Sequence, residues 1–306
     1  MAKHCFAFIG ALFLIFAPSA VIGSTTEAPL TVFVSILPQS QMVQRIGGER
    51  VDVQVMVTAG ANPHAFEPRP AQMAALAKAH IYFSVGVEFE NMWLPKFSAI
   101  NRNMTVVAID QGIEKLPMAA DHHHDHGHGH SHKSKGKADP HQFDPHIWLS
   151  PDLIKVMAAT IRDALASATP AHAAEFEQRY ATYLHELDEL DQRIRQRLKD
   201  QAGTRFMVFH PSWGYFAHQY GLVQVPIEIE GKEPKPAQLQ KLIREAKAAN
   251  IRVIFAQPQF SSRSAQMIAD AINARIVTAD PLSPDLLAHL LDLANAIETA
   301  ETGKRP

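Results

Sequence analysis

Cysteine is almost absent from this sequence, since its 306 residues include only Cys5. This residue precedes an apolar run near the N-terminus, within a segment that we expect to be cleaved off, so the mature chain would contain no thiol. A disulfide framework is therefore excluded, and the fold must depend on its apolar cores. Any metal site must use nitrogen and oxygen ligands, because no thiolate is left to bind a metal.

Strong charge of one sign and several common motifs are also absent. Lys and Arg total 29 against 31 Asp and Glu and form no basic stripe, which argues against a nucleic-acid partner. Neither GxGxxG nor GxxxxGK followed by Ser or Thr occurs, so neither a dinucleotide site nor a P-loop is indicated. HExxH and GxSxG, two hydrolase motifs, are missing as well.

The N-terminus has the composition of a secretory signal. Lys3 precedes the apolar run CFAFIGALFLIFA, and SAVIGS offers small residues for cleavage after Gly23. We therefore expect residues 1–23 to be a signal peptide and the protein to be exported; an uncleaved membrane anchor is the alternative. No later segment has roughly 20 consecutive apolar residues, so we expect a soluble mature protein.

Short β-branched runs alternate with helical stretches from Thr31 onward, which is typical of parallel sheets with helices on both faces and right-handed connections. The predicted strands are 31–37, 51–57, 81–86, 104–109, 205–210, 222–230, 251–259 and 274–280. The predicted helices between them are 39–47, 70–79, 236–250 and 264–273, together with a short helix between strands 205–210 and 222–230. A helical pattern also follows Pro151, and another begins near Pro284. These elements predict an α/β fold.

The longest periodic run follows Pro170 and ends before Gly203. Its apolar stripe recurs at steps of three and four residues and comprises Phe176, Tyr180, Leu184, Leu187, Leu190, Ile194 and Leu198. A helix over this run would be roughly 45 Å long, more than one small domain needs. We predict that residues 170–202 form a backbone helix joining two lobes; a core helix or a coiled-coil pairing is the alternative.

The predicted fold thus has two lobes, each with a mainly parallel sheet flanked by helices. The first lobe covers residues 24–169 and the second covers residues 203–306. A polar, low-complexity insertion at residues 119–142 interrupts the first lobe. Nine of the 17 histidines lie within residues 121–146, and we separate them into two kinds.

Histidines of the first kind lie where open α/β sheets bind ligands, just past the carboxyl ends of strands. His64 follows strand 51–57, His210 ends strand 205–210, and His146 lies at the edge of the insertion. Asp280 ends the last strand. Three imidazoles and one carboxylate form a complete tetrahedral zinc site. Taken singly, each histidine is also compatible with an ordinary surface or core position, and Asp280 with a helix cap.

The second kind belongs to the insertion, where histidines alternate with Asp, Gly and Ser. Such a segment has too few apolar residues to offset its ordering entropy, so we expect it to be disordered. Imidazole binds zinc, copper and nickel, and we predict weak auxiliary metal binding here, with a solvated loop as the alternative. The candidate residues are His122, His123, His124, His126, His128, His130, His132 and His141.

Six stretches along the mature chain resemble one family, in that family's order. They are GANPHAFEPRPAQM, DPHIWLSP, FHPSWGYFAHQYGL, IEGKEPKPAQLQKLIREAK, FAQPQFS and TADPL. The chain resembles the ZnuA-like periplasmic proteins that serve ABC importers of zinc and manganese. The resemblance implies two α/β lobes joined by a long helix, with the metal between them. It also implies a membrane permease as partner, and His64, His146, His210 and Asp280 as ligands.

The resemblance also bears on the choice of metal. Manganese-binding members carry a carboxylate where this sequence has His210, and an imidazole in place of a hard oxygen favours zinc. Some zinc members have a disulfide in the second lobe, which this chain cannot form, and water can replace Asp280. We therefore expect Zn²⁺ as the transported ligand of a monomeric protein that is not an enzyme and binds no organic substrate.

Three other functions are the alternatives. A manganese- or iron-binding homologue would share the fold and the permease. A zinc buffer would share the site without any permease. A zinc hydrolase would need a general base near an open metal position, for which Glu67 is the candidate.

Overall fold

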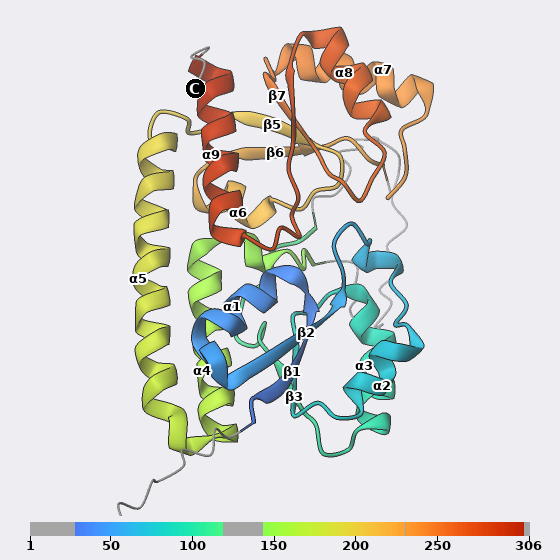
Figure 1. The fold of residues 1–306 in the computed structure, drawn as a ribbon. Helices are drawn as coiled ribbons and strands as arrows, with labels where there is room; N and C mark the ends of the chain where they lie inside the picture. Colours follow the sequence, from blue (N-terminus) through green and yellow to red (C-terminus); the bar gives the residue numbers. More distant parts are fainter. Residues whose placement is uncertain (1–27, 119–142, 230, 303–306) are drawn as a thin grey trace, which may run out of the picture.

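The computed structural model describes residues 28–118, 143–229 and 231–302, which form two lobes stacked along one long helix (Figure 1). The predicted signal peptide at residues 1–23 lies outside the described residues. The predicted insertion at 119–142, with its eight candidate histidines, also lies outside them. None of the helices in the described ranges combines the length and hydropathy needed to cross a membrane.

The first lobe contains a four-stranded parallel sheet of order β2-β1-β3-β4. Its strands are β1 (Leu30–Ile36), β2 (Val51–Val57), β3 (Ile81–Ser84) and β4 (Thr105–Ala108). Its helices are α1 (Leu37–Gly47), α2 (Pro70–Leu76), α3 (Glu88–Ile100) and α4 (Pro151–Ala168). Helices α1 and α4 lie on one side of the sheet and α2 and α3 on the other (Figure 1).

The second lobe repeats this plan with the strand order β6-β5-β7-β8, again entirely parallel. Its strands are β5 (Arg205–Val208), β6 (Val223–Pro226), β7 (Val253–Ala256) and β8 (Arg275–Thr278). Its helices are α6 (Gly214–Gln219), α7 (Pro236–Ala248), α8 (Arg263–Ile272) and α9 (Leu286–Thr302). The predicted fold class, two parallel α/β lobes, is therefore confirmed.

The central strands show why these sequences form parallel sheets. Val32 to Ile36 of β1 are all buried, and so are all four residues of β7. A strand covered on both faces by helices reads as a continuous apolar run rather than an alternating one. The βα connections then bring the carboxyl ends of the strands to one edge of each sheet, where the candidate ligands lie.

Helix α5 (Ala173–Leu198) joins the lobes, after a 3-10 turn at Pro170–His172. It packs against α1 and α4 of the first lobe and α9 of the second (Figure 1). Its buried side chains are Phe176, Tyr183, Leu187, Leu190, Ile194 and Leu198. The predicted stripe differs at Tyr180 and Leu184, which are only partly buried, whereas Tyr183 is almost fully buried. The predicted domain boundaries after residues 169 and 202 stay predictions.

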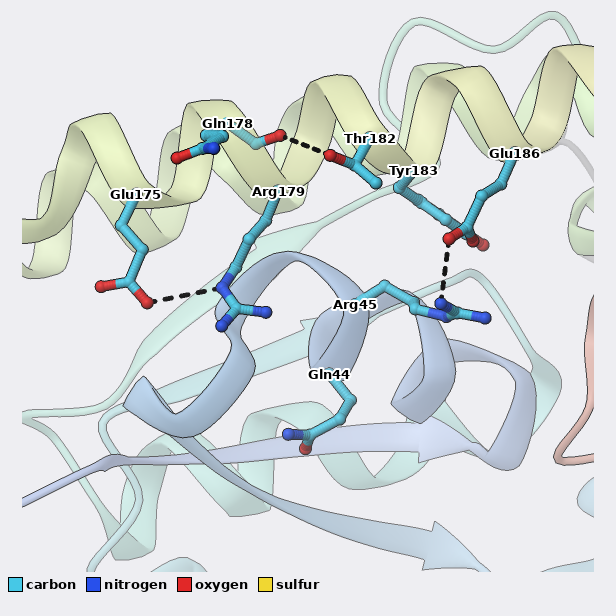
Figure 2. Close-up of a pocket in the computed structure, with 8 residues that line it drawn as sticks. All are labelled: Gln44, Arg45, Glu175, Gln178, Arg179, Thr182, Tyr183 and Glu186. Carbon is cyan, nitrogen blue, oxygen red and sulfur yellow. Dashed lines mark hydrogen bonds and ion pairs between the residues drawn. The ribbon is translucent and has the colours of Figure 1, made fainter.

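Ion pairs fasten α5 to the first lobe around a hollow of about 380 Å³ (Figure 2). Arg45 of α1 pairs with Glu186 at 3.0 Å, and Arg50 pairs with Glu175 at 3.1 Å. Within α5 itself, Arg179 also pairs with Glu175, at 3.4 Å. The hydrogen bond from Arg50 to Glu175 is the main cause of the lowered pKa of that carboxyl. Every charged group that lines this hollow has a partner of opposite sign. We therefore interpret the charged groups as contacts that hold α5 in place.

One apolar core extends through both lobes. It contains Trp148 of the first lobe, Leu187 of α5 and Phe216 of the second lobe, all fully or almost fully buried. Hydrogen bonds add to it, because Trp148 Nε1 donates to Pro281 O at 2.8 Å and Tyr215 Oη donates to Asp144 O at 2.7 Å. A smaller core lies under α7 and α8. The lobes are therefore packed together and not merely tethered.

Two elements differ from the sequence-based expectation. The sequence pattern predicts no helix at α3, which forms although Pro95 lies inside it and proline normally disrupts a helix interior. Strand β6 ends at Pro226, whereas the predicted strand continued to residue 230. Proline cannot donate a ladder hydrogen bond, which accounts for the earlier end.

Candidate metal centre

Three histidines converge between the two lobes. A ligand nitrogen from each of His64, His146 and His210 lies within 4.8 Å of the others. The Nε2 atoms of His64 and His210 are 3.1 Å apart. The ring centroids lie 4.7 Å apart for His64 and His210, 5.2 Å for His146 and His210, and 6.3 Å for His64 and His146. Two of these residues come from the first lobe and one from the second.

His64 is positioned by a short turn beyond β2. The side chain of Asn62 accepts a hydrogen bond from His64 N at 2.9 Å and caps the 3-10 turn Pro63–Ala65. Pro63, at the start of this turn, has a backbone φ suited to it and no N–H to satisfy. The His64 imidazole is partly exposed, so it forms the open side of the site.

His146 is held by a carboxylate two residues before it. Asp144 Oδ1 accepts hydrogen bonds from His146 N at 2.9 Å and from His146 Nδ1 at 2.7 Å. Both side chains are almost completely buried. The 3-10 turn Ile147–Leu149 follows, and Ser150 then caps α4 by accepting from Leu153 N at 3.4 Å. His146 is thus fixed at both its backbone and its ring.

His210 follows β5 in the second lobe and is buried. Its Nδ1 lies 2.7 Å from Glu228 Oε1, and its backbone N–H donates to Gln257 Oε1 at 2.7 Å. Burial lowers the pKa of His210, and the nearby His146 and His64 lower it further, while Glu228 acts in the opposite direction. The imidazole is therefore neutral at neutral pH, which is the form that binds metal.

Each imidazole turns its Nδ1 toward a carboxylate. The partner of His64 is Glu88 of α3 at 3.3 Å, that of His146 is Asp144, and that of His210 is Glu228. Such contacts keep the proton on Nδ1 and leave the Nε2 lone pair free for a metal. They also raise the basicity of the ligand nitrogen. The site therefore presents three oriented nitrogen donors.

Sequence reasoning missed these three carboxylates. Asp144 had a visible signal, since it stands two residues before a candidate ligand. Glu228 had another, because an acidic residue in the apolar stretch LVQVPIEIE needs a partner when it is buried. Glu88 had none, since its position relative to His64 depends on how α3 packs against the turn Pro63–Ala65.

The structure does not bring every predicted residue into the trio. Asp280 lies outside the three-histidine group, and its Oδ1 accepts hydrogen bonds from Gln259 Nε2 at 2.7 Å and Leu282 N at 2.8 Å. Glu67, the candidate general base, is exposed and is also outside the group. The histidines of the insertion lie outside the described residues.

Two α/β lobes with histidines converging between them have the arrangement expected of a two-lobed metal-binding protein. The sequence matches the family described as the periplasmic zinc-uptake complex component A over residues 32–300. The chain belongs to this family, as the resemblance in the sequence implied.

Individual relatives agree with the family. The zinc-binding protein AdcA of Streptococcus pyogenes is 30% identical over 84% of this chain and 51% of its own length. The chain thus spans about half of that protein. The high-affinity zinc uptake system protein ZnuA of Bacillus subtilis is 31% identical over 80% of this chain and 76% of its own.

Solved structures agree as well. The crystal structure of ZnuA is 39% identical and matches with a TM-score of 0.80, covering 89% of this chain and 99% of that one. A ZnuA deletion mutant with zinc bound is also 39% identical, with a TM-score of 0.79 and coverage of 91% and 100%. Both therefore share the two-lobed fold described above.

Proposed function

We propose that this protein captures Zn²⁺ in the periplasm and delivers it to the membrane permease of an ABC importer. The observation that carries the proposal is the convergence of three carboxylate-backed imidazoles between two lobes. The zinc-uptake family and the names of its zinc-binding members support the same function. Zinc is here the cargo, and the protein contributes the ligands that hold it.

The donor set favours zinc over manganese. Mn²⁺ prefers carboxylate, carbonyl and water oxygens, whereas imidazole nitrogen suits zinc. His64, His146 and His210 supply nitrogen only, and the three carboxylates near them are engaged by the imidazoles. Asp280 or a water molecule would complete a tetrahedral set, and we propose Asp280 as a fourth ligand that is available rather than permanent.

The histidine-rich insertion would act as an auxiliary collector that binds zinc weakly. The described residues that flank it are joined next to the site, since Pro117 and Phe143 form an antiparallel bridge and Asp144 N donates to Leu116 O at 2.8 Å. Asp144 in turn holds His146. Zinc held on the insertion would therefore be released close to the main site, at an effective concentration on the order of millimolar.

Deletion of residues 121–139 tests the role of the insertion. Calorimetric titration should show one tight zinc site with nearly unchanged affinity and no weaker additional zinc. Loss of the tight phase would show that the insertion belongs to the main site. An unchanged total stoichiometry would show that the insertion binds no zinc.

Metal analysis and growth test the function itself. Protein purified without an affinity tag should contain zinc, and mass spectrometry of the exported protein should show cleavage after Gly23. A strain lacking the gene should grow poorly under zinc limitation and recover when the permease and the protein are both present. Normal growth would favour a zinc buffer that serves no permease.

A further inference from the structure

A glutamine from the neighbouring strand end holds Asp280. Gln259 Nε2 donates to Asp280 Oδ1 at 2.7 Å, and the N–H of Leu282 donates to the same oxygen at 2.8 Å. Hydrogen bonds to a carboxylate are stronger than those between neutral groups. In this arrangement the carboxylate stays outside the three-histidine group.

Within the part of the chain that the structure describes, the oxygen of the Gln259 amide has no hydrogen bond that would fix the orientation of the amide group. Gln259 Oε1 is buried and accepts a hydrogen bond from none of the described residues. An amide that turns its NH₂ toward a carboxylate must turn its oxygen away, and a buried oxygen without a donor is unfavourable. The bond to Asp280 is therefore the favourable contact that keeps the amide in this orientation.

The backbone beside Asp280 is fixed. Ala279 N donates to Ala256 O of β7 at 2.9 Å, and Pro281 O accepts from Trp148 Nε1 of the first lobe at 2.8 Å. Movement of the carboxylate toward the histidines must therefore come from rotation of its side chain between staggered rotamers. That rotation requires the hydrogen bonds from Gln259 Nε2 and from Leu282 N to break, and the bond from Gln259 is the one that a side-chain substitution can remove.

The turn that carries Gln259 also contacts a zinc ligand. Gln257 Oε1 accepts from His210 N, and Phe260 N donates to Gln257 O at 3.2 Å, which closes the turn after β7. One turn thus positions the backbone of His210 and holds the side chain of Asp280. A change in the Gln259 side chain could therefore alter the position of Asp280 without displacing His210.

We propose that Gln259 is a latch that withholds Asp280 from zinc and thereby limits how tightly the site binds. The inference rests on the proposed function, because it takes the three histidines as zinc ligands. A group held in a non-binding conformation contributes to affinity only in proportion to the fraction that is free. Three imidazoles and a water then hold the zinc that a carrier must later release, and a freed Asp280 binds it more firmly.

A double-mutant cycle tests the latch on the full chain, with Gln259→Met, Asp280→Asn and the double variant. Gln259→Met keeps the length of the side chain and removes its donor. Gln259→Leu serves in its place if the Met variant does not fold by circular dichroism. Gln266→Met is the matched control, because Gln266 Nε2 donates to Asp270 Oδ1 at 2.8 Å on the exposed face of α8. Zinc affinity comes from competition titration and the dissociation rate from stopped-flow chelation.

The latch predicts that Gln259→Met binds zinc about tenfold more tightly, equivalent to about 1.4 kcal/mol, and releases it correspondingly more slowly. The gain should disappear in the Asp280→Asn background, and Gln266→Met should match the wild type. Unchanged or weaker binding by both Gln259 variants, or an equal gain without Asp280, would overturn the latch. Failure of the wild type to bind zinc would instead overturn the proposed function on which it rests.

Discussion

Asp144 provides a sharp test of how the site is oriented. Its Oδ1 accepts from both the backbone and the Nδ1 of His146, at 2.9 and 2.7 Å, in a pair that is almost completely buried. Asp144→Asn preserves the shape and an oxygen for the backbone bond, but removes the charge that raises the basicity of the imidazole. Loss of such a partner weakens metal binding by about 10- to 100-fold, or about 1.4 to 2.7 kcal/mol.

Competition titration with a zinc chelator measures this loss, with Asp152→Asn as the matched control. Asp152 lies in the first turn of α4, is exposed and pairs with Lys155 at 3.4 Å. The same chemical change there should leave zinc affinity unaltered. Wild-type affinity in Asp144→Asn would refute the argument that the carboxylate sets the tautomer and basicity of His146. Equal losses in both variants would point to a general effect of charge.

Further expectations follow from the same geometry. Replacing any one of the three site histidines by Ala should weaken zinc binding about a thousandfold or more, measured by competition titration. A histidine whose Ala variant keeps wild-type zinc affinity is not a ligand. Asp280→Ala should reduce zinc affinity far less, since water can take the place of the carboxylate and Gln259 already restrains that carboxylate. Zinc affinity should fall from pH 7 to 5 as protons compete for imidazole nitrogens of ordinary pKa about 6.5; a flat profile would argue against a histidine site. Burial lowers the pKa of His289 to about 4 despite two nearby aspartates. As pH falls, His289 is therefore protonated in the unfolded state before it is protonated in the folded state. Metal-free protein should accordingly lose stability between about pH 6.5 and pH 4. The free energy of unfolding, measured with urea, should fall less steeply with decreasing pH in His289→Gln than in the wild type.

Much of the fold is readable from the sequence because its signals are local. Buried parallel strands such as β1 and β7 are continuous apolar runs, and α5 has a sustained stripe at helical spacing. Helix α3 is not readable in this way, since Pro95 opposes it and only packing in the folded lobe supports it. Tyr183 takes the buried place expected for Leu184 because neighbouring positions differ little in a periodic pattern, and packing decides between them.

The site is only partly readable for a related reason. The histidines follow strand ends, and the topology of parallel sheets brings such positions together. The orientation of each ring depends on a partner that the sequence does not identify; Glu228, for example, lies 18 positions after His210. The restraint of Asp280 by Gln259 likewise arises where two strand ends meet, 21 positions apart. These pairings are made by the tertiary structure.

Competition between zinc and manganese for untagged protein measures whether the three-histidine group is a zinc site. Metal-free protein would be titrated with each ion against a chelator of known affinity, at pH 7. We expect one tight site per chain that prefers zinc to manganese and is lost in His210→Ala. Preference for manganese, or a tight zinc site that survives His210→Ala, would contradict it.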